Sequence, residues 1–399
     1  MPDLLRPTPS TTILEGTEGY PRFSEAEMQR RRAAIGTRME DHGVRHALLY
    51  GVDRSGWAVG WITGWPVTRE AAVVVTPGEH DVLLVQFRNH VPNARLLAPE
   101  AEVRWGGPST MQTAGEILAA RAADRVGVVG PITAAHRDLL ASAVGDVVDL
   151  GAAASELRLI KSDEEVAWVR MGAELSDRSI DALRSEVVPG RTELDLAAIV
   201  EAAYLAAGGL NHIHYFGVTA MDAPSRAVPA QYPSSRPIRS GDVLVTELSA
   251  SFWGYAGQVL RTFTIAADPT PLYRELHDVA QAAFERVLAV LRDGTHVDEV
   301  VEAASVIEEA GFTTYDDLVH GFVGGYLPPV LGSRSRTLEP PPDMAFRAGM
   351  TVVVQPNVIT ADERAGVQTG ELLLVTPDGA ERLHRAPDGL ARIGDRTGG

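Results

Sequence analysis

Cysteine is absent from the 399-residue sequence, which excludes disulfides, thiolate nucleophiles and cysteine-ligated zinc or iron–sulfur sites. The sequence also lacks any apolar run approaching the ~20 residues that a membrane-spanning helix needs. Residues 1–17 carry Asp3 and Glu15 and contain no compact apolar stretch followed by small residues, so they do not read as a signal peptide. We therefore expect a cytoplasmic protein without a membrane partner.

Positive charge is scarce, with 36 lysines and arginines against 53 aspartates and glutamates and a net charge of −17. A chain this acidic repels phosphates, so we expect no nucleic-acid partner. Several catalytic patterns are missing too, namely Gly-x-Ser-x-Gly, His-Glu-x-x-His, Gly-x4-Gly-Lys and Gly-x-Gly-x-x-Gly. The expected partner is a small-molecule substrate.

The sequence does contain enough apolar material, 45% of its residues, for two domains. In the first part, apolar runs predict strands that alternate with helix-forming segments. The strands are expected at 46–52, 70–76, 81–87 and 125–129, and helices at 25–39 and 113–122. This alternation predicts an α/β domain over residues 1–155.

The second part, residues 156–399, mixes long helices with grouped strands. Ser162, followed three residues later by Glu165, predicts a capping box that starts a helix, and Pro189-Gly190 ends it. Further helices are expected at 192–207, 272–291 and 297–310, and strands at 211–218, 243–250, 259–265, 351–355 and 371–376. This pattern predicts an α+β domain.

Seven short motifs follow one another in a fixed order along the chain. They are Gly60–Gly64, Leu157–Ser162, Gly241-Asp242 with Glu247–Ala250, Gly254-Tyr255 with Arg261–Phe263, Val319–Gly321, Gly349-Met350 with Pro356, and Gly366-Val367 with Val375-Thr376. Together they resemble the creatinase/prolidase family, the pita-bread, Xaa-Pro peptidase-like proteins. The resemblance implies an α/β N-terminal domain plus an α+β pita-bread C-terminal catalytic domain. It also implies a homodimer in which the N-terminal domain of one chain covers the site of the other.

The family holds two metal ions with two aspartates, a histidine and two glutamates. The matching positions here are Glu247, Gln258, His320, Gln355 and Gly370, with Glu371 next to the last. Two amides and a glycine do not supply the anionic oxygens that two divalent cations need. We therefore expect a degenerate metal site and no metal or other cofactor. A single weakly held ion on Glu247 and His320, helped by Glu371, is the alternative.

Three residues are the candidates for proton transfer. Strand alternation puts Glu247 on one face with three apolar or small neighbours, where it acts as a general acid or base or forms an ion pair with Arg261. His320 precedes a glycine-rich segment and titrates near neutrality. In creatinase another histidine serves as the acid/base, and its position here is Ala230 or Gln231. His214 is the candidate to replace it; His212, on the same strand face, is the alternative for this role, and packing or hydrogen bonding is the alternative for both.

The remaining candidates bind substrate. Gln258 and Gln355 suit a neutral amide, urea or amidine group because they both donate and accept hydrogen bonds. The other candidates for the wall of the site are His212, Tyr326, Arg334 and Glu371, with Tyr326 and Arg334 in a proline-rich loop. The sequence thus predicts a metal-independent, creatinase-like hydrolase or lyase acting on a C–N bond of a small polar molecule. The alternatives are an Xaa-Pro-type metallopeptidase with a reduced one-metal site and a non-catalytic ligand-binding scaffold.

Overall fold

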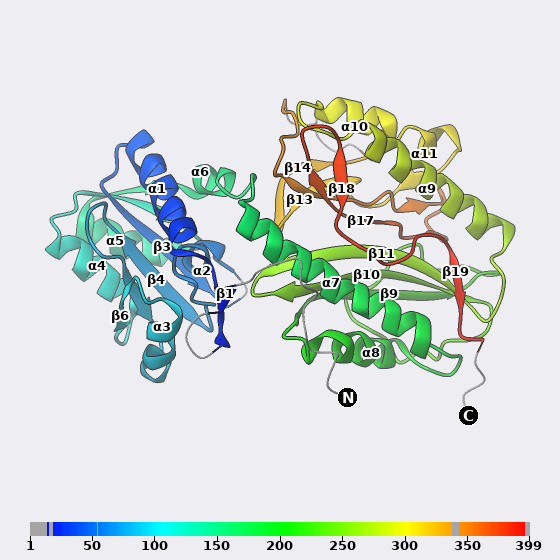
Figure 1. Ribbon diagram of the computed structural model, residues 1–399, viewed down its shortest axis with the longest axis horizontal. Helices are drawn as coiled ribbons and strands as arrows, with labels where there is room; N and C mark the ends of the chain where they lie inside the picture. Colours follow the sequence, from blue (N-terminus) through cyan, green and yellow to red (C-terminus); the bar gives the residue numbers. More distant parts are fainter. Residues whose placement is uncertain (1–13, 16–18, 54, 337–342, 396–399) are drawn as a thin grey trace. The chain divides into compact units, whose positions relative to one another are not determined.

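The computed structural model describes residues 14–15, 19–53, 55–336 and 343–395 (Figure 1). These residues form two compact units, of which the first ends at Arg158 and the second begins at Leu159. The sequence placed this boundary between residues 155 and 156, at the end of helix α6 (Gly151–Glu156). Within the described ranges, no helix is both long and apolar enough to span a bilayer.

The first unit contains a six-stranded sheet in the order β6-β5-β4-β3-β7-β8. The strands are β3 (His46–Val52), β4 (Glu70–Val75), β5 (Val82–Val85), β6 (Glu102–Trp105), β7 (Arg125–Val129) and β8 (Asp146–Asp149). All four expected strands are present. The sequence analysis missed β6 and β8, which have only four residues each and lie at the two edges of the sheet.

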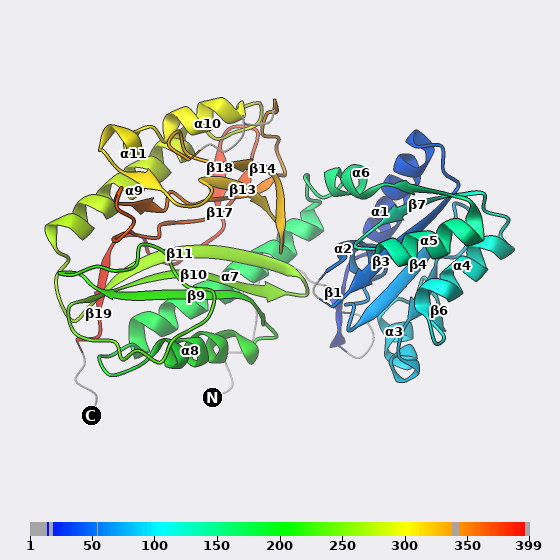
Figure 2. The same ribbon diagram turned by 180° about the vertical axis from the view of Figure 1, so that it is seen from behind.

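Helices cover both faces of this sheet, as Figures 1 and 2 show. One face packs against α1 (Glu25–Asp41), α2 (Trp57–Thr63), α3 (Val91–Leu97) and α6, and the other against α4 (Thr110–Ala120) and α5 (Ala134–Val144). The sheet is therefore buried on both sides, which explains its nearly continuous apolar strands. The unit is the α/β domain that the alternating pattern predicted.

The second unit is built on a nine-stranded sheet with the main order β14-β13-β15-β17-β11-β10-β9. Its strands are β9 (Leu210–Ala220), β10 (Asp242–Phe252), β11 (Tyr255–Ile265), β13 (Val319–Phe322), β14 (Tyr326–Leu331), β15 (Thr351–Val354), β17 (Gly370–Val375), β18 (Ala380–Arg382) and β19 (Ala391–Ile393). A separate pair in this unit joins short strands β12 (Thr313–Thr314) and β16 (Val358–Ile359), and another, in the first unit, joins β1 (Leu14–Glu15) and β2 (Pro21–Arg22). The five strands expected for this unit correspond to β9, β10, β11, β15 and β17.

The helices of the second unit are α7 (Asp163–Glu186), α8 (Glu193–Leu205), α9 (Pro271–Val290), α10 (Val297–Ala303) and α11 (Val306–Glu309). The Ser162 side chain accepts a hydrogen bond from the Glu165 backbone N–H, and the Glu165 side chain accepts one from the Ser162 backbone N–H. The predicted capping box is therefore confirmed. Helix α7 then packs against β11 at backbone distance. A Cβ on Gly257 would lie 2.3 Å from the Cα of Ala173, so only glycine allows this approach. This contact fixes β11, which carries Gln258.

The segment predicted as a proline-rich loop is partly a strand. Residues Tyr326–Leu331 form β14, which pairs with β13 at the end of the main strand order. The prediction was wrong because proline cannot donate to a strand partner but is tolerated where one side of the strand has no partner. As a strand, this segment brings Tyr326 beside β13.

Candidate active site

The centre of the candidate site is the face of the sheet that carries Glu247. In the antiparallel register Glu247 lies opposite Tyr215 of β9 and Leu260 of β11, and Ser249 lies opposite Gln258. Opposed residues of antiparallel strands point to the same side, so Glu247 and Gln258 share a face. Gln258 Nε2 donates to Glu247 Oε1 at 3.0 Å.

Gln355, which directly follows β15, and His320 of β13 also contribute to the site. Gln258 Nε2 also donates to Gln355 Oε1 at 3.0 Å. The Nδ1 atom of His320 lies 3.2 Å from the carbonyl oxygen of Gly321. A carbonyl only accepts, so Nδ1 carries the proton and Nε2 is an acceptor. Burial lowers the pKa of His320, which keeps its ring neutral.

Two aspartates that the sequence analysis did not single out complete the site. Asp316 and Asp317 lie between β12 and β13, just before His320. Gln355 Nε2 lies 3.3 Å from Asp317 Oδ2, and Asn357 Nδ2 lies 3.3 Å from both carboxylate oxygens of Asp316. Each acidic group of the site therefore has an amide N–H beside it. The signal that could have found them is the acidic pair four and three residues before a candidate histidine.

The three carboxyl groups repel one another. Burial, followed by the charges of Asp316 and Asp317, raises the pKa of Glu247 to about 8. Burial and the charge of Asp317 raise the pKa of Asp316 to about 7. Among the described residues, neither arginine nor lysine forms an ion pair with any of the three. The basic side chain that lies near them is His320, whose Nε2 is 3.8 Å from Asp317 Oδ2. Without a cation, the cluster lowers its charge by holding protons.

Tyr326 lies at the exposed side of this cluster. Its hydroxyl donates to Asp317 Oδ1 at 3.2 Å, and its ring stacks on that of His320 at 4.0 Å between centroids. The residue is 54% exposed, whereas His320 is fully buried. The predicted wall residue thus marks where the cluster meets solvent.

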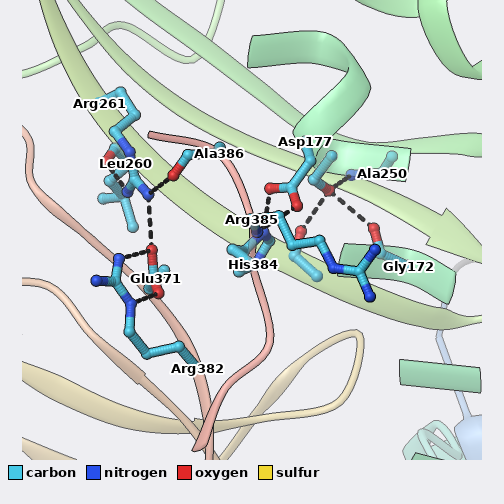
Figure 3. Close-up of polar contacts among 12 residues, drawn as sticks. Gly172, Asp177, Ala250, Leu260, Arg261, Glu371, Arg382, His384, Arg385 and Ala386 are labelled. Carbon is cyan, nitrogen blue, oxygen red and sulfur yellow. Dashed lines mark hydrogen bonds and ion pairs between the residues drawn. The ribbon is translucent and has the colours of Figure 1, made fainter. Parts of the chain in front are cut away.

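Glu371 does not join this site, and Figure 3 shows it between Arg261 and Arg382. It pairs in register with Val259, one residue from Gln258, and therefore points to the opposite side of the sheet from Glu247. Its carboxylate is buried between two guanidinium groups, 2.6 Å from Arg261 and 2.5 Å from Arg382. The ion pair that the sequence offered between Arg261 and Glu247 is absent. The prediction that Glu371 lines the wall of the site was wrong, because its register places the side chain on the opposite face of the sheet.

Gly370 shows why the last family ligand cannot be regained at its own position. The residue has a φ of +143°, and a Cβ there would lie 2.1 Å from the carbonyl oxygen of Val354. A side chain at this position requires a shift of the backbone. The structure therefore leaves no room for a carboxylate at residue 370.

Three further candidates remain, of which His214 and Arg334 have partners outside the site. His214 is opposite Leu248, on the other face of β10, with Nδ1 3.0 Å from Glu201 of α8. That placement removes the geometric basis for His214 as an acid/base partner of Glu247. His212 is exposed, with its ring 5.8 Å from that of Phe322. Arg334 is half-exposed and pairs with Glu302 at 2.5 Å.

These side chains do not fit a pair of divalent cations. At the family's ligand positions only Glu247 is a carboxylate and His320 an imidazole, while Gln258 and Gln355 bond to each other and to the acidic groups. Across the ranges that the structure describes, no three His, Asp or Glu side chains are grouped to hold a metal ion. Neutral amides in place of carboxylates explain this misfit.

Comparison with known proteins identifies the relatives of this chain. Residues 167–377 match the sequence model described as "Metallopeptidase family M24". The chain is 28% identical to "Probable dipeptidase PepE" of Mycobacterium bovis over 275 residues, covering 66% of this chain and 68% of that protein. It is 26% identical to "Xaa-Pro dipeptidase" of Pyrococcus furiosus over 233 residues, covering 57% and 64%.

Solved structures share the fold. The prolidase of Pyrococcus horikoshii has a TM-score of 0.77 at 19% identity, with 90% of this chain and 99% of that chain covered. Dipeptidase PepE of Mycobacterium ulcerans has a TM-score of 0.76 at 23% identity, with 93% and 99% covered. These likenesses confirm the predicted fold, an N-terminal domain followed by a pita-bread domain.

The same findings correct the predicted activity. A metal-independent, creatinase-like hydrolase was expected, but the matching family is one of metallopeptidases and the named relatives are dipeptidases. The misfit of the donor set is therefore a feature of this chain within a metallopeptidase family. Because the family match spans more than half of the sequence, the chain belongs to metallopeptidase family M24.

Proposed function

We propose that this chain is an Xaa-Pro-type peptidase that acts on short peptides. The observation that carries the proposal is the convergence of Glu247, Gln258, His320 and Gln355 on one face of the sheet. These are the positions at which the family's site residues stand. The names of the relatives supply the substrate class, since they include Xaa-Pro dipeptidases.

The residues present offer defined chemistry to a bound peptide. Glu247 has a pKa of about 8, so at neutral pH its carboxyl group holds a proton that it can give to a leaving nitrogen. His320 Nε2 is a buried acceptor with no hydrogen-bond partner in the structure. Since the donor set does not fit a metal pair, no catalytic step through a metal follows from these side chains.

The test is release of proline from Ala-Pro and Leu-Pro, compared with hydrolysis of Ala-Ala. The assay is run on chelator-treated protein and again with manganese, cobalt or zinc. We expect hydrolysis of the Xaa-Pro peptides under at least one of these conditions, lowered about 100-fold by Glu247→Gln. Glu275→Gln, on the exposed face of α9, is the matched control and should retain full activity. Peptide binding without hydrolysis under every condition would instead indicate a non-catalytic scaffold.

Two further predictions, one from the family resemblance and one from the composition, belong to this proposal. A homodimer is expected, and light scattering of the full chain at micromolar concentration measures its mass. A monomer there would contradict it. A cytoplasmic location is expected from the composition and is tested by fractionation of the producing cell.

A further inference from the structure

Three acidic side chains on the candidate face have no internal counter-charge. We call Glu247, Asp316 and Asp317 the anionic cluster. All three are partly exposed, and in the part of the chain that the structure describes none forms an ion pair with arginine or lysine. Several buried carboxylates elsewhere in this protein are paired with arginine, as Asp242 is with Arg236 at 2.7 Å. The anionic cluster is thus available to a cation from outside the protein.

Buried acceptors around the cluster are also unsatisfied. Gln258 Oε1, Asn357 Oδ1 and His320 Nε2 have no hydrogen-bond partner in the structure, and all three residues are fully buried. The amide orientations follow from the network, because both NH2 groups donate to carboxylates of the cluster. A buried acceptor without a donor is unfavourable, because it loses the hydrogen bond that water would give it. The site therefore lacks hydrogen-bond donors as well as positive charge.

We propose that the anionic cluster binds the primary ammonium group of a small ligand. An ammonium group supplies what is missing, one positive charge and three N–H donors with no acceptor. An ammonium group can donate hydrogen bonds to oxygen and imidazole acceptors, and it does not require the fixed coordination geometry of a metal ion. A divalent cation needs several anionic oxygens within about 2.6 Å, and no such grouping exists among the described residues.

The cluster is reachable by such a ligand. Tyr326, which is half-exposed, donates to Asp317. Asp317 retains 15% exposure of its side chain. A small amine can therefore approach along Tyr326 with its charged group towards Asp317.

The ammonium can come from two sources. One is the amino terminus of a peptide, and this source rests on the peptidase function proposed above. The other is a free amine that is not a peptide. Both sources present the same primary ammonium group, so the experiment uses a probe of each kind.

The experiment is isothermal titration calorimetry on the full chain with three probes: Ala-Pro, N-acetyl-Ala-Pro and n-butylammonium. The comparison is made for the wild type, for the double variant Asp316→Asn/Asp317→Asn and for the control Asp278→Asn. Asp278 is an exposed residue of α9, so the control makes the same type of charge change outside the cluster. Thermal melts establish that every variant is folded. We expect the double variant to weaken binding of the amines at least about tenfold and the control to leave it unchanged.

The outcomes separate this inference from the proposed function. Ala-Pro binding at least about tenfold more tightly than its acetylated form supports a peptide ammonium. Binding of n-butylammonium but of neither peptide supports the ammonium site and counts against the peptidase function. Equal binding of both peptides, equal effects of the double variant and the control, or no binding of any probe would overturn the ammonium site. So would stoichiometric binding of manganese or zinc that the double variant abolishes.

Discussion

Two acidic regions on opposite sides of one sheet satisfy their charge in different ways. Glu371 is fully buried and is clamped by Arg261 and Arg382. The anionic cluster has more carboxyl groups, yet its neighbours are amides, the Tyr326 hydroxyl and a neutral histidine. The comparison shows that the Glu371 carboxylate is neutralised by arginines of the protein, whereas the cluster is not. Glu371 has cations supplied by the protein, whereas the anionic cluster has none among the described residues, which is the basis for proposing a cationic ligand there.

The largest effect should come from breaking the internally paired region. Arg261→Gln leaves the Glu371 carboxylate with one guanidinium and also removes donors to the carbonyl groups of Gly370 and Ala386. Loss of one partner of a buried pair costs about 3–5 kcal/mol, so urea denaturation should show a loss of that size. The control is Arg286→Gln, because Arg286 forms an exposed pair with Glu309 at 3.8 Å. A control effect above about 1 kcal/mol would make the contrast meaningless.

A somewhat smaller effect is expected at the boundary between the two regions. Gly370→Ala forces a Cβ against the Val354 carbonyl at a positive φ, so we expect a loss of about 1–3 kcal/mol in free energy of unfolding. Gly379→Ala is the matched control, since a Cβ there meets no atom within 4 Å. Equal stability of the two variants would show that residue 370 can accept a side chain after all.

The smallest effect sharpens the comparison through pH. The pKa of Glu247 is raised from 4.5 to about 8 by burial and by the two aspartates, so the folded state holds this proton more tightly than the unfolded state. The resulting stability is present below about pH 4.5 and is lost as the pH rises to about 8. Glu247→Gln should therefore raise the melting temperature at pH 8 by roughly 2–4 °C and leave it nearly unchanged at pH 5. A variant that is less stable than wild type at pH 8 would contradict a repulsive cluster.

Part of the candidate site could be assembled from the sequence. Strand alternation and motif order brought Glu247, Gln258, His320 and Gln355 to one location, and the structure joins three of them by hydrogen bonds. Strand alternation depends on the period of two along a strand, and motif order depends on where the ligand strands lie in the family that the sequence resembles. The two-domain fold was predicted from the order of strands and helices and from the same order of motifs.

The errors arose where register or a loop decides the outcome. Glu371 is adjacent to a ligand position, but a shift of one residue in a strand turns a side chain to the other face. His214 was misjudged for the same reason, since its register partner is Leu248 and not Glu247. Asp316 and Asp317 lie between two strands, where no periodicity indicates direction.

The most direct measurement of the central claim is a crystal structure of the full chain with Ala-Pro bound. The account predicts that the peptide's amino nitrogen lies within about 3 Å of a carboxylate oxygen of Glu247, Asp316 or Asp317. It also predicts that at least one of the acceptors Gln258 Oε1, Asn357 Oδ1 and His320 Nε2 then gains a donor. A peptide whose amino group lies away from all three carboxylates, or a metal ion held between them, would contradict the account.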